Sequence, residues 1–264
     1  MLQTIKLILY YLAYQLAFSG FFTVAYMLLH HMNGIPTMAD KGFVLVSITA
    51  QLLGTMAMGI HLWAGRYVNL HSPLRSRRPG LLFLTAGVLI VAMGCWTNYL
   101  SELFQLPDNM EDVFRAMLNN PIGVASVALF APLVEEMLFR GGIQGHLTRQ
   151  WKSPAAGIVV ASLIFGVIHG NPVQIPFAFV TGLVLGWVYY RTGSLWPGIW
   201  MHFINNASSV AFYHLAAHPD AGMQKELGSI PALTLAMGGF AVSVLCIRLI
   251  GKKLTLPVAQ DSLT

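Results

Sequence analysis

Apolar residues form eight long runs along the chain, separated by short segments that hold most of the charged residues. A helix needs about 20 consecutive, mostly apolar residues to cross a bilayer. The pattern therefore predicts an all-α, polytopic membrane protein with about eight transmembrane helices. The runs cover Ile5–Leu29, Gly42–Trp63, Leu81–Leu100, Pro121–Phe139, Pro154–His169, Val173–Tyr190, Leu195–Tyr213 and Ile230–Ile250.

The composition changes this picture little but excludes other classes of protein. Of the 264 residues, 56% are hydrophobic and 9% are charged, whereas soluble domains carry roughly 25% charged residues. So few charges could not cover a water-facing surface, so we expect lipid to surround most of the chain. We expect an integral protein of the bacterial inner (cytoplasmic) membrane, with membrane lipid as a partner and without nucleic acid. The sequence leaves the oligomeric state open.

The charged residues are distributed unevenly between alternate loops. Lys and Arg accumulate in the cytoplasmic loops of membrane proteins. The outward loops hold few cations and most of the acidic residues, which predicts cytoplasmic N- and C-termini. The basic residues that follow runs two, four, six and eight are Arg66, Arg75, Arg77, Arg78, Arg149, Lys152, Arg191, Arg248, Lys252 and Lys253.

The segment between runs three and four has its own periodicity. Asp108 is expected to cap a short helix whose apolar residues recur at positions i, i+3, i+4, i+7 and i+8 from Met110. This spacing predicts an amphipathic helix. It would lie in the outer membrane interface or pack as a loop helix.

Ionisable residues inside a span are expensive, at roughly 2.5–3.5 kcal/mol each, and they mark function by default. Here they cluster. Run four contains Glu135, Glu136 and Arg140, run five ends at His169, and run seven contains His202 and Asn206.

Helical geometry assigns directions to these side chains. Glu136 and Arg140 are four residues apart and can form an ion pair. Glu135 is rotated by about 100° from Glu136, so it can point into a cavity between helices. If helix four continues to about Arg149, Glu135 lies roughly 21 Å from that end, a depth compatible with His169 and His202.

This inventory of groups suits hydrolysis. A partly desolvated carboxylate beside a histidine can bind a water molecule and take its proton. An amide and an imidazole on the opposite wall can stabilise an oxyanion. Glu135, His169 and His202 could instead hold a divalent metal such as zinc. The residues leave open whether the cofactor is a metal or absent, although the sequence contains no HExxH motif.

Three motifs occur in order on successive runs: Glu135-Glu136-x-x-x-Arg140, Phe165-x-x-x-His169 and His202-x-x-x-Asn206. Together they resemble the CPBP family, which includes type II CAAX prenyl endopeptidases and Abi-like bacteriocin-processing proteins.

The resemblance implies an intramembrane endopeptidase. In it, Glu135 and His169 would activate water, and His202 and Asn206 would stabilise the tetrahedral intermediate. Glu136 and Arg140 would organise the site, and the substrate would be a peptide or a membrane protein.

The same resemblance divides the chain into three parts. Residues 1–120 would hold three transmembrane helices and the outer amphipathic segment. Residues 121–211 would form the catalytic core, and residues 212–264 the last transmembrane helix and a cytoplasmic tail. Two other functions compete: a non-enzymatic immunity or scaffold protein, and a proton-coupled transporter built on Glu and His relays. The absence of a repeated half argues against the transporter.

Overall fold

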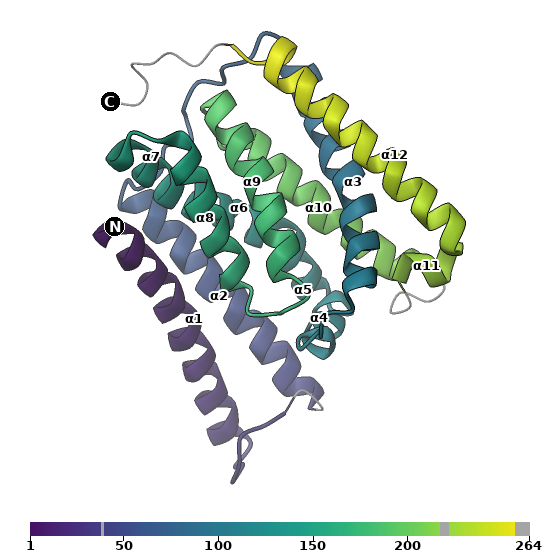
Figure 1. The fold of residues 1–264 in the computed structure, drawn as a ribbon. Coiled ribbons are helices and arrows are strands. Elements are labelled where there is room, and N and C mark those ends of the chain that lie inside the picture. The colour runs from purple at the N-terminus through teal and green to yellow at the C-terminus, as the bar shows by residue number, and fades with distance from the viewer. Residues whose placement is uncertain (38–39, 217–221, 257–264) are drawn as a thin grey trace.

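The computed structural model describes residues 1–37, 40–216 and 222–256, which form helices joined by loops (Figure 1). The described residues also include an isolated β-bridge between Ser76 and Thr255. The residues beyond 256, where the tail was predicted, lie outside the described part. The α-helices are α1 (Leu2–Leu29), α2 (Lys41–Ala64), α3 (Pro79–Phe104), α4 (Glu111–Leu118), α5 (Pro121–Ala125), α6 (Ala131–Glu136), α7 (Gly145–Trp151), α8 (Pro154–Ile168), α9 (Ile175–Thr192), α10 (Trp196–Leu215), α11 (Gly222–Leu227) and α12 (Ser229–Leu249).

The predicted all-α membrane architecture is confirmed. Five helical stretches are long and apolar enough to cross a membrane by length and composition. The other three predicted spans correspond to α8, α9 and α10. Helix α8 has only 15 residues, and α9 and α10 contain polar residues that lower their mean hydropathy. The count of eight spans therefore stays a prediction. The five stretches are Leu2–Leu29, Lys41–Ala64, Pro79–Phe104, Pro121–Trp151 and Ser229–Leu254.

The fourth predicted span is longer than its apolar run. It continues through Phe139 to Trp151 and alternates α-helical turns with two π-helical stretches, Ser126–Phe130 and Met137–Gln144. Single π-helical turns inside α-helices occur frequently at functional sites. Because the helix continues to Trp151, Glu135 lies near its middle, which is the condition for meeting the histidines of α8 and α10.

The other helices surround this fourth stretch, Pro121–Trp151, which we call the broken helix because of its π-helical interruptions. In Figure 1, α1 and α2 lie side by side at one flank and α3 and α12 at the other, with α8, α9 and α10 between them. Helix α6 contacts both α2 and α10. The glutamates therefore lie on a helix that has neighbours on several sides.

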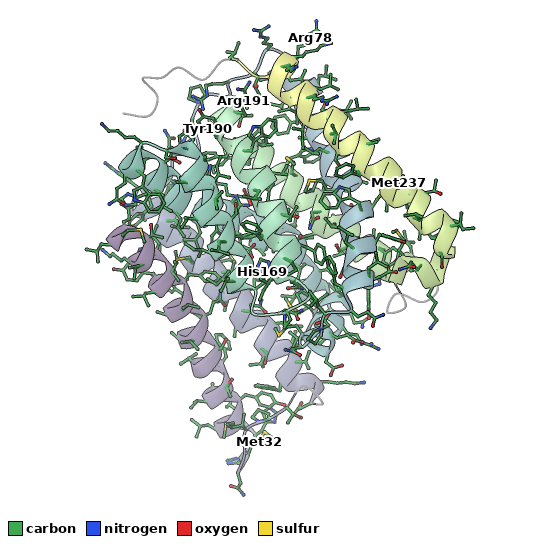
Figure 2. All side chains as sticks on the ribbon, viewed as in Figure 1. Met32, Arg78, His169, Tyr190, Arg191 and Met237 are labelled. Atoms are coloured by element: carbon green, nitrogen blue, oxygen red, sulfur yellow. The ribbon has the colours of Figure 1, made fainter. Side chains whose placement is uncertain are left out.

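Hydrogen bonds tie several helix ends together at one end of the molecule. The Met1 ammonium group donates to Oε1 of Gln150 at 2.6 Å. Arg191 Nη2 donates to Oγ1 of Thr255 at 2.9 Å. Arg78, Tyr190 and Arg191 all lie at this end in Figure 2. The predicted basic loops are thus gathered, and their cytoplasmic location stays a prediction.

The outer segment contains the predicted short helix, with one correction. Helix α4 begins at Glu111, and its N-cap residue Met110 makes no side-chain cap. Asp108 is therefore not the cap. Its Oδ1 atom instead accepts a hydrogen bond from the Met110 backbone N–H at 2.9 Å, which forms a turn just before the helix.

Candidate active site

Glu136 and Arg140 form an ion pair in the interior of the bundle. Arg140 Nε lies 3.2 Å from Glu136 Oε2, and the two side chains are 1% and 0% exposed. The pair follows the i, i+4 spacing expected from the sequence. Such a buried pair is tolerated only where further contacts compensate for desolvation. Here Arg140 Nη2 donates to the Gly182 carbonyl at 3.4 Å, and the guanidinium lies 4.6 Å from the centroid of the Phe165 ring.

His202 on α10 lies between the two adjacent carboxylates. Its Nδ1 atom is 3.0 Å from Glu136 Oε1, and its Nε2 atom is 3.7 Å from Glu135 Oε2. An ionised Glu136 accepts the hydrogen of Nδ1–H, which leaves Nε2 facing Glu135. His202 thus contacts both glutamates, one with each ring nitrogen.

The side chains of the two glutamates differ in their exposed fraction. The Glu136 side chain has no exposed surface, whereas 18% of the Glu135 side chain is exposed. Both oxygens of Glu136 already face a partner, one the imidazole of His202 and the other the guanidinium of Arg140. Glu135 is thus the carboxylate that can meet a water molecule or a substrate.

Gly198 lets α10 come close to the buried carboxylate. A Cβ atom at this position would lie 2.9 Å from Glu136 Oε2. Gly198 precedes His202 by four residues, so both lie on the face of α10 that meets Glu136. The sequence prediction missed this glycine, although its i−4 spacing from His202 could have indicated it.

Phe165 connects the motifs of three helices. Its ring is 2% exposed. It meets the His169 ring edge-on at a centroid distance of 4.8 Å and the His202 ring at 5.7 Å. Together with the cation–π contact to Arg140, these contacts place one aromatic ring against all three motifs. The first residue of the Phe165-x-x-x-His169 motif therefore has a packing role.

His169 caps the C-terminal end of α8, just before the turn to α9 (Figure 2). Its Nδ1 atom lies 2.7 Å from the Phe165 carbonyl oxygen. A carbonyl is only an acceptor, so Nδ1 carries the hydrogen. In the neutral ring, Nε2 then keeps its lone pair and can accept a proton or a hydrogen bond.

The turn after His169 is held by Asn171, which the sequence prediction missed. This residue is fully buried. Its Nδ2 atom donates to Asp108 Oδ1 at 2.9 Å, and its Oδ1 atom accepts from the Asn109 backbone N–H at 3.2 Å. These bonds connect residues more than 60 positions apart. They fix the His169 turn to the segment that precedes α4.

Asn206 lies one turn beyond His202 and contacts the broken helix. Its Nδ2 atom donates to the Val127 carbonyl at 2.9 Å. Its Oδ1 atom accepts from Asn205 Nδ2 at 3.1 Å. Val127 belongs to the first π-helical stretch, where the shifted hydrogen-bond ladder leaves a carbonyl for a side chain. One of the two Nδ2 hydrogens of Asn206 is committed to this bond.

The backbone carbonyls of two glycines on α9 accept hydrogen bonds from polar side chains of the broken helix. Gln144, another residue that the sequence prediction did not select, donates to the Gly186 carbonyl at 2.8 Å. Arg140 makes the corresponding contact to Gly182 one turn earlier. A Cβ at Gly186 would lie 2.6 Å from Gln144 Oε1. The small residues at i and i+4 of α9 thus allow close packing, as in other membrane helix pairs.

The side chains do not form a three-ligand metal site. Within residues 1–37, 40–216 and 222–256, no group of three His, Cys, Asp or Glu side chains is placed to hold a metal ion. Glu135 and His202 are close to each other, but His169 does not complete a set with them. The predicted donor set of Glu135, His169 and His202 therefore does not fit a metal in this arrangement.

The structure places four of the predicted residues in direct contact and the other two, His169 and Asn206, next to this group. Glu135, Glu136, Arg140 and His202 form a continuous chain of contacts. His169 joins this chain through the ring of Phe165, and Asn206 lies one turn further along α10 from His202.

Comparison with known proteins agrees with the family that the three motifs suggested. Residues 117–208 match the family described as type II CAAX prenyl endopeptidase Rce1-like. This segment contains all three motifs, so the resemblance inferred from them is confirmed for this part of the chain. No solved structure matches the protein.

Two curated bacterial proteins are similar over about half of the chain. One is YdiL of Bacillus subtilis (strain 168), which is provisionally named a membrane peptidase. It is 28% identical over 131 residues, which cover 48% of this chain and 53% of YdiL. The membrane-embedded CAAX protease MroQ of Staphylococcus aureus (strain USA300) is 32% identical over 122 residues, covering 44% of this chain and 49% of its own. The chain thus spans about half the length of the curated relatives it matches.

Proposed function

Starting from a core segment that matches type II CAAX prenyl endopeptidases, we propose that this integral membrane protein is an intramembrane endopeptidase. The observation that carries the proposal is the unequal pair of glutamates. Glu136 is fully buried against Arg140 and His202, whereas Glu135 is partly exposed beside the same histidine. A purely structural ion pair would need only one carboxylate. A second, partly open carboxylate suits acid–base work on a bound molecule.

In the proposed reaction, Glu135 accepts a proton from a water molecule. The water oxygen attacks the carbonyl carbon of a peptide bond, and the carbonyl π electrons move onto oxygen to form a tetrahedral oxyanion. The C–N bond then breaks, and the proton held by Glu135 passes to the leaving nitrogen. The products are a carboxylic acid and an amine, so one water molecule is consumed for each bond cleaved.

The other side chains support this sequence of steps. His169 Nε2 keeps its lone pair and orients the attacking water. His202 Nε2–H and the second amide hydrogen of Asn206 stabilise the oxyanion. The 3.7 Å separation between Glu135 Oε2 and His202 Nε2 leaves room for an atom about 3 Å from both, as a reacting group requires. Glu136 and Arg140 hold His202 in this orientation.

The substrate is a peptide or a segment of a membrane protein. Cleavage by the purified full chain in nanodiscs tests this function. Mass spectrometry over a library of peptides and lipopeptides would compare the wild type with Glu135→Ala and with Glu111→Ala, a change on the exposed outer helix α4. Cleavage by the wild type and Glu111→Ala, lost in Glu135→Ala, is the expected result.

A second arm of the experiment adds a chelator to the wild type. A loss of cleavage that zinc restores would show that a metal takes part. Equal cleavage by folded Glu135→Ala would contradict the proposed role of the carboxylate. A folded wild type that cleaves no library member, while the relatives cleave theirs under the same conditions, would favour a non-enzymatic scaffold protein.

A further inference from the structure

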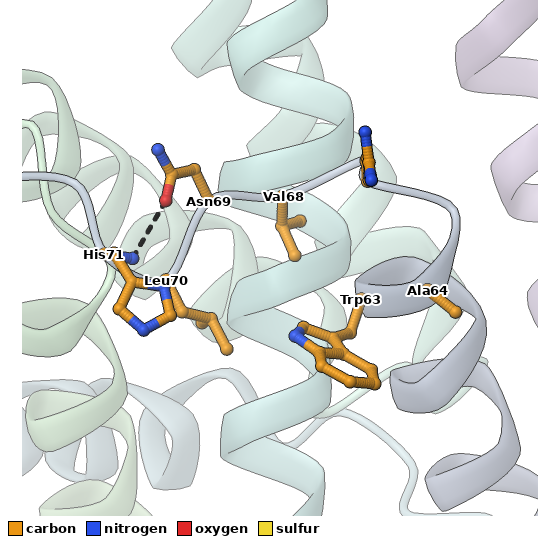
Figure 3. Close-up of a pocket in the computed structure, with 7 residues that line it drawn as sticks. Trp63, Ala64, Val68, Asn69, Leu70 and His71 are labelled. Atoms are coloured by element: carbon orange, nitrogen blue, oxygen red, sulfur yellow. Dashed lines mark hydrogen bonds between the residues drawn. The ribbon is translucent and has the colours of Figure 1, made fainter.

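A pocket lies at the end of α2, and none of the residues of the glutamate–histidine cluster lines it. Its volume is about 360 Å³. Figure 3 shows Trp63 and Ala64 at the helix end and the following segment curling past them. Because α2 is long and apolar enough to cross a membrane, we expect its terminus at the boundary between membrane and water. Its lining residues are Trp63, Ala64, Arg66, Val68, Asn69, Leu70 and His71.

Arg66 occupies a backbone conformation that disfavours it. Its φ angle is +56°, in the left-handed region that L-residues avoid. The Tyr67 N–H donates to the Leu62 carbonyl and the Arg66 N–H to the Trp63 carbonyl, at 3.0 and 3.1 Å. These two bonds form a Schellman motif, in which the left-handed position is usually glycine. Glycine is the usual residue here, and His31, Gln105 and Lys152 share the left-handed conformation of Arg66 in this chain.

The polar groups that line this pocket suit an anion. Arg66 offers five N–H donors, and none of the described residues forms an ion pair or hydrogen bond with its guanidinium. Asn69 and His71 line the same pocket, and the Asn69 Oδ1 acceptor is already used by the His71 backbone N–H at 2.9 Å. No carboxylate is among the lining residues.

The position of the pocket identifies the kind of anion. The exposed indole of Trp63 is typical of side chains at the level of lipid headgroups. Basic pockets at this depth bind the head groups of anionic lipids. We propose that the pocket binds the phosphate group of an anionic phospholipid, held by Arg66, Asn69 and His71. This inference does not depend on the proposed peptidase activity.

The pocket is connected to the candidate active site. Val68 packs so closely on the broken helix that a Cβ at Gly141 would lie 2.5 Å from its Cγ1 atom. Gly141 directly follows Arg140. The Trp196 indole N–H, at the start of α10, donates to the Leu70 carbonyl at 3.1 Å. A lipid bound in the pocket would therefore brace a segment that contacts both helices of the site.

Native mass spectrometry of the full chain in detergent, titrated with phosphatidylglycerol, tests the proposal. The wild type should bind one such lipid more tightly than phosphatidylcholine. Arg66→Gln should weaken this binding about fivefold, the effect expected of one basic residue near a membrane surface. Arg77→Gln, which removes an exposed arginine outside the pocket, should leave it unchanged. Equal weakening in both variants, or equal binding of phosphatidylcholine, would overturn the site.

Two further measurements separate the source of the anion and the effect of folding. Inorganic phosphate that displaces the lipid at similar concentrations would overturn the lipid as the ligand. Arg66→Gly relieves the left-handed arginine, so it should raise the unfolding temperature without lipid and abolish the stabilisation that phosphatidylglycerol gives the wild type. Retention of that stabilisation in Arg66→Gly would also overturn the proposal.

Discussion

His202 Nδ1 lies 3.0 Å from Oε1 of Glu136, a carboxylate without exposed surface. This single contact joins the first and third motifs of the chain, which are 66 residues apart. It leaves the second ring nitrogen of His202 directed at Glu135. The two adjacent glutamates therefore serve one histidine from two sides, and their different burial predicts different consequences of mutation.

The first prediction contrasts the two glutamates by stability. Glu136→Gln removes the charge that balances Arg140, and breaking a buried ion pair destabilises a protein by about 3–5 kcal/mol. Glu135→Gln alters a partly exposed carboxylate at 3.7 Å from its partner and should change the free energy of unfolding by less than about 1 kcal/mol. Thermal unfolding in the same detergent checks both variants. Equal destabilisation by the two changes would contradict the assigned roles.

The second prediction concerns the glycine of α10. Gly198→Ala places a methyl group 2.9 Å from Glu136 Oε2. Such overpacking of an interior costs typically about 1–3 kcal/mol, and it should also displace His202. Gly94→Ala on α3 is the matched control, because no side chain or distant backbone atom lies within 4 Å of that added Cβ. The unfolding temperature should fall for Gly198→Ala alone, and no difference between the variants would show that the contact is absent.

The third prediction concerns the two hydrogen bonds of Asn171 that hold the turn after His169. Asn171→Ala removes two hydrogen bonds of a fully buried side chain, and each buried group left without a partner costs about 1–3 kcal/mol. Hydrogen exchange of the turn between α8 and α9 should become faster than in the wild type. Asn119→Ala, an exposed asparagine at the end of α4, serves as the control.

A rescue experiment separates the hydrogen bond between Asp108 and Asn171 from a general packing effect. The double variant Asp108→Asn with Asn171→Asp exchanges donor and acceptor, and it should restore slow exchange more fully than Asp108→Ala with Asn171→Ala. If the exchanged pair is no better than the two alanines, the proposed hydrogen bonds do not hold the turn.

The fourth prediction concerns Phe165, whose ring contacts Arg140, His169 and His202. Phe165→Leu keeps an apolar side chain but loses the ring contacts, and a cation–π contact out of water is worth about 2 kcal/mol. We expect a lower unfolding temperature and a reduced catalytic rate for any peptide that the wild type cleaves. Phe212→Leu, at an exposed position on α10, should change neither quantity.

The sequence predicted those features that depend on local spacing. Eight apolar runs coincide with helices, and the i, i+4 relation of Glu136 and Arg140 predicted their ion pair. The contact between Glu136 and His202 could not be predicted, because helix spacing does not determine how two distant helices face each other. The two π-helical stretches change the register of the fourth helix without any signal in the hydrophobic pattern.

The outer segment shows the same limit. Asp108 was predicted to cap a helix on the basis of its type and position, which was wrong because α4 begins only at Glu111 and Asp108 forms a turn before it. The same Oδ1 atom also accepts a long-range hydrogen bond from Asn171, which local spacing could not predict. Asn171 was missed for a related reason: its partners Asp108 and Asn109 are distant in sequence.

Cleavage of one identified peptide by the wild type and by Glu135→Gln is the most direct test of the central claim. The substitution preserves the size of the side chain and removes its basicity. General-base catalysis contributes typically about 10²–10⁴-fold to a rate, so the variant should cleave at least about 100-fold more slowly while its unfolding temperature stays near that of the wild type. A folded Glu135→Gln variant that cleaves at the wild-type rate would contradict the proposed role of Glu135.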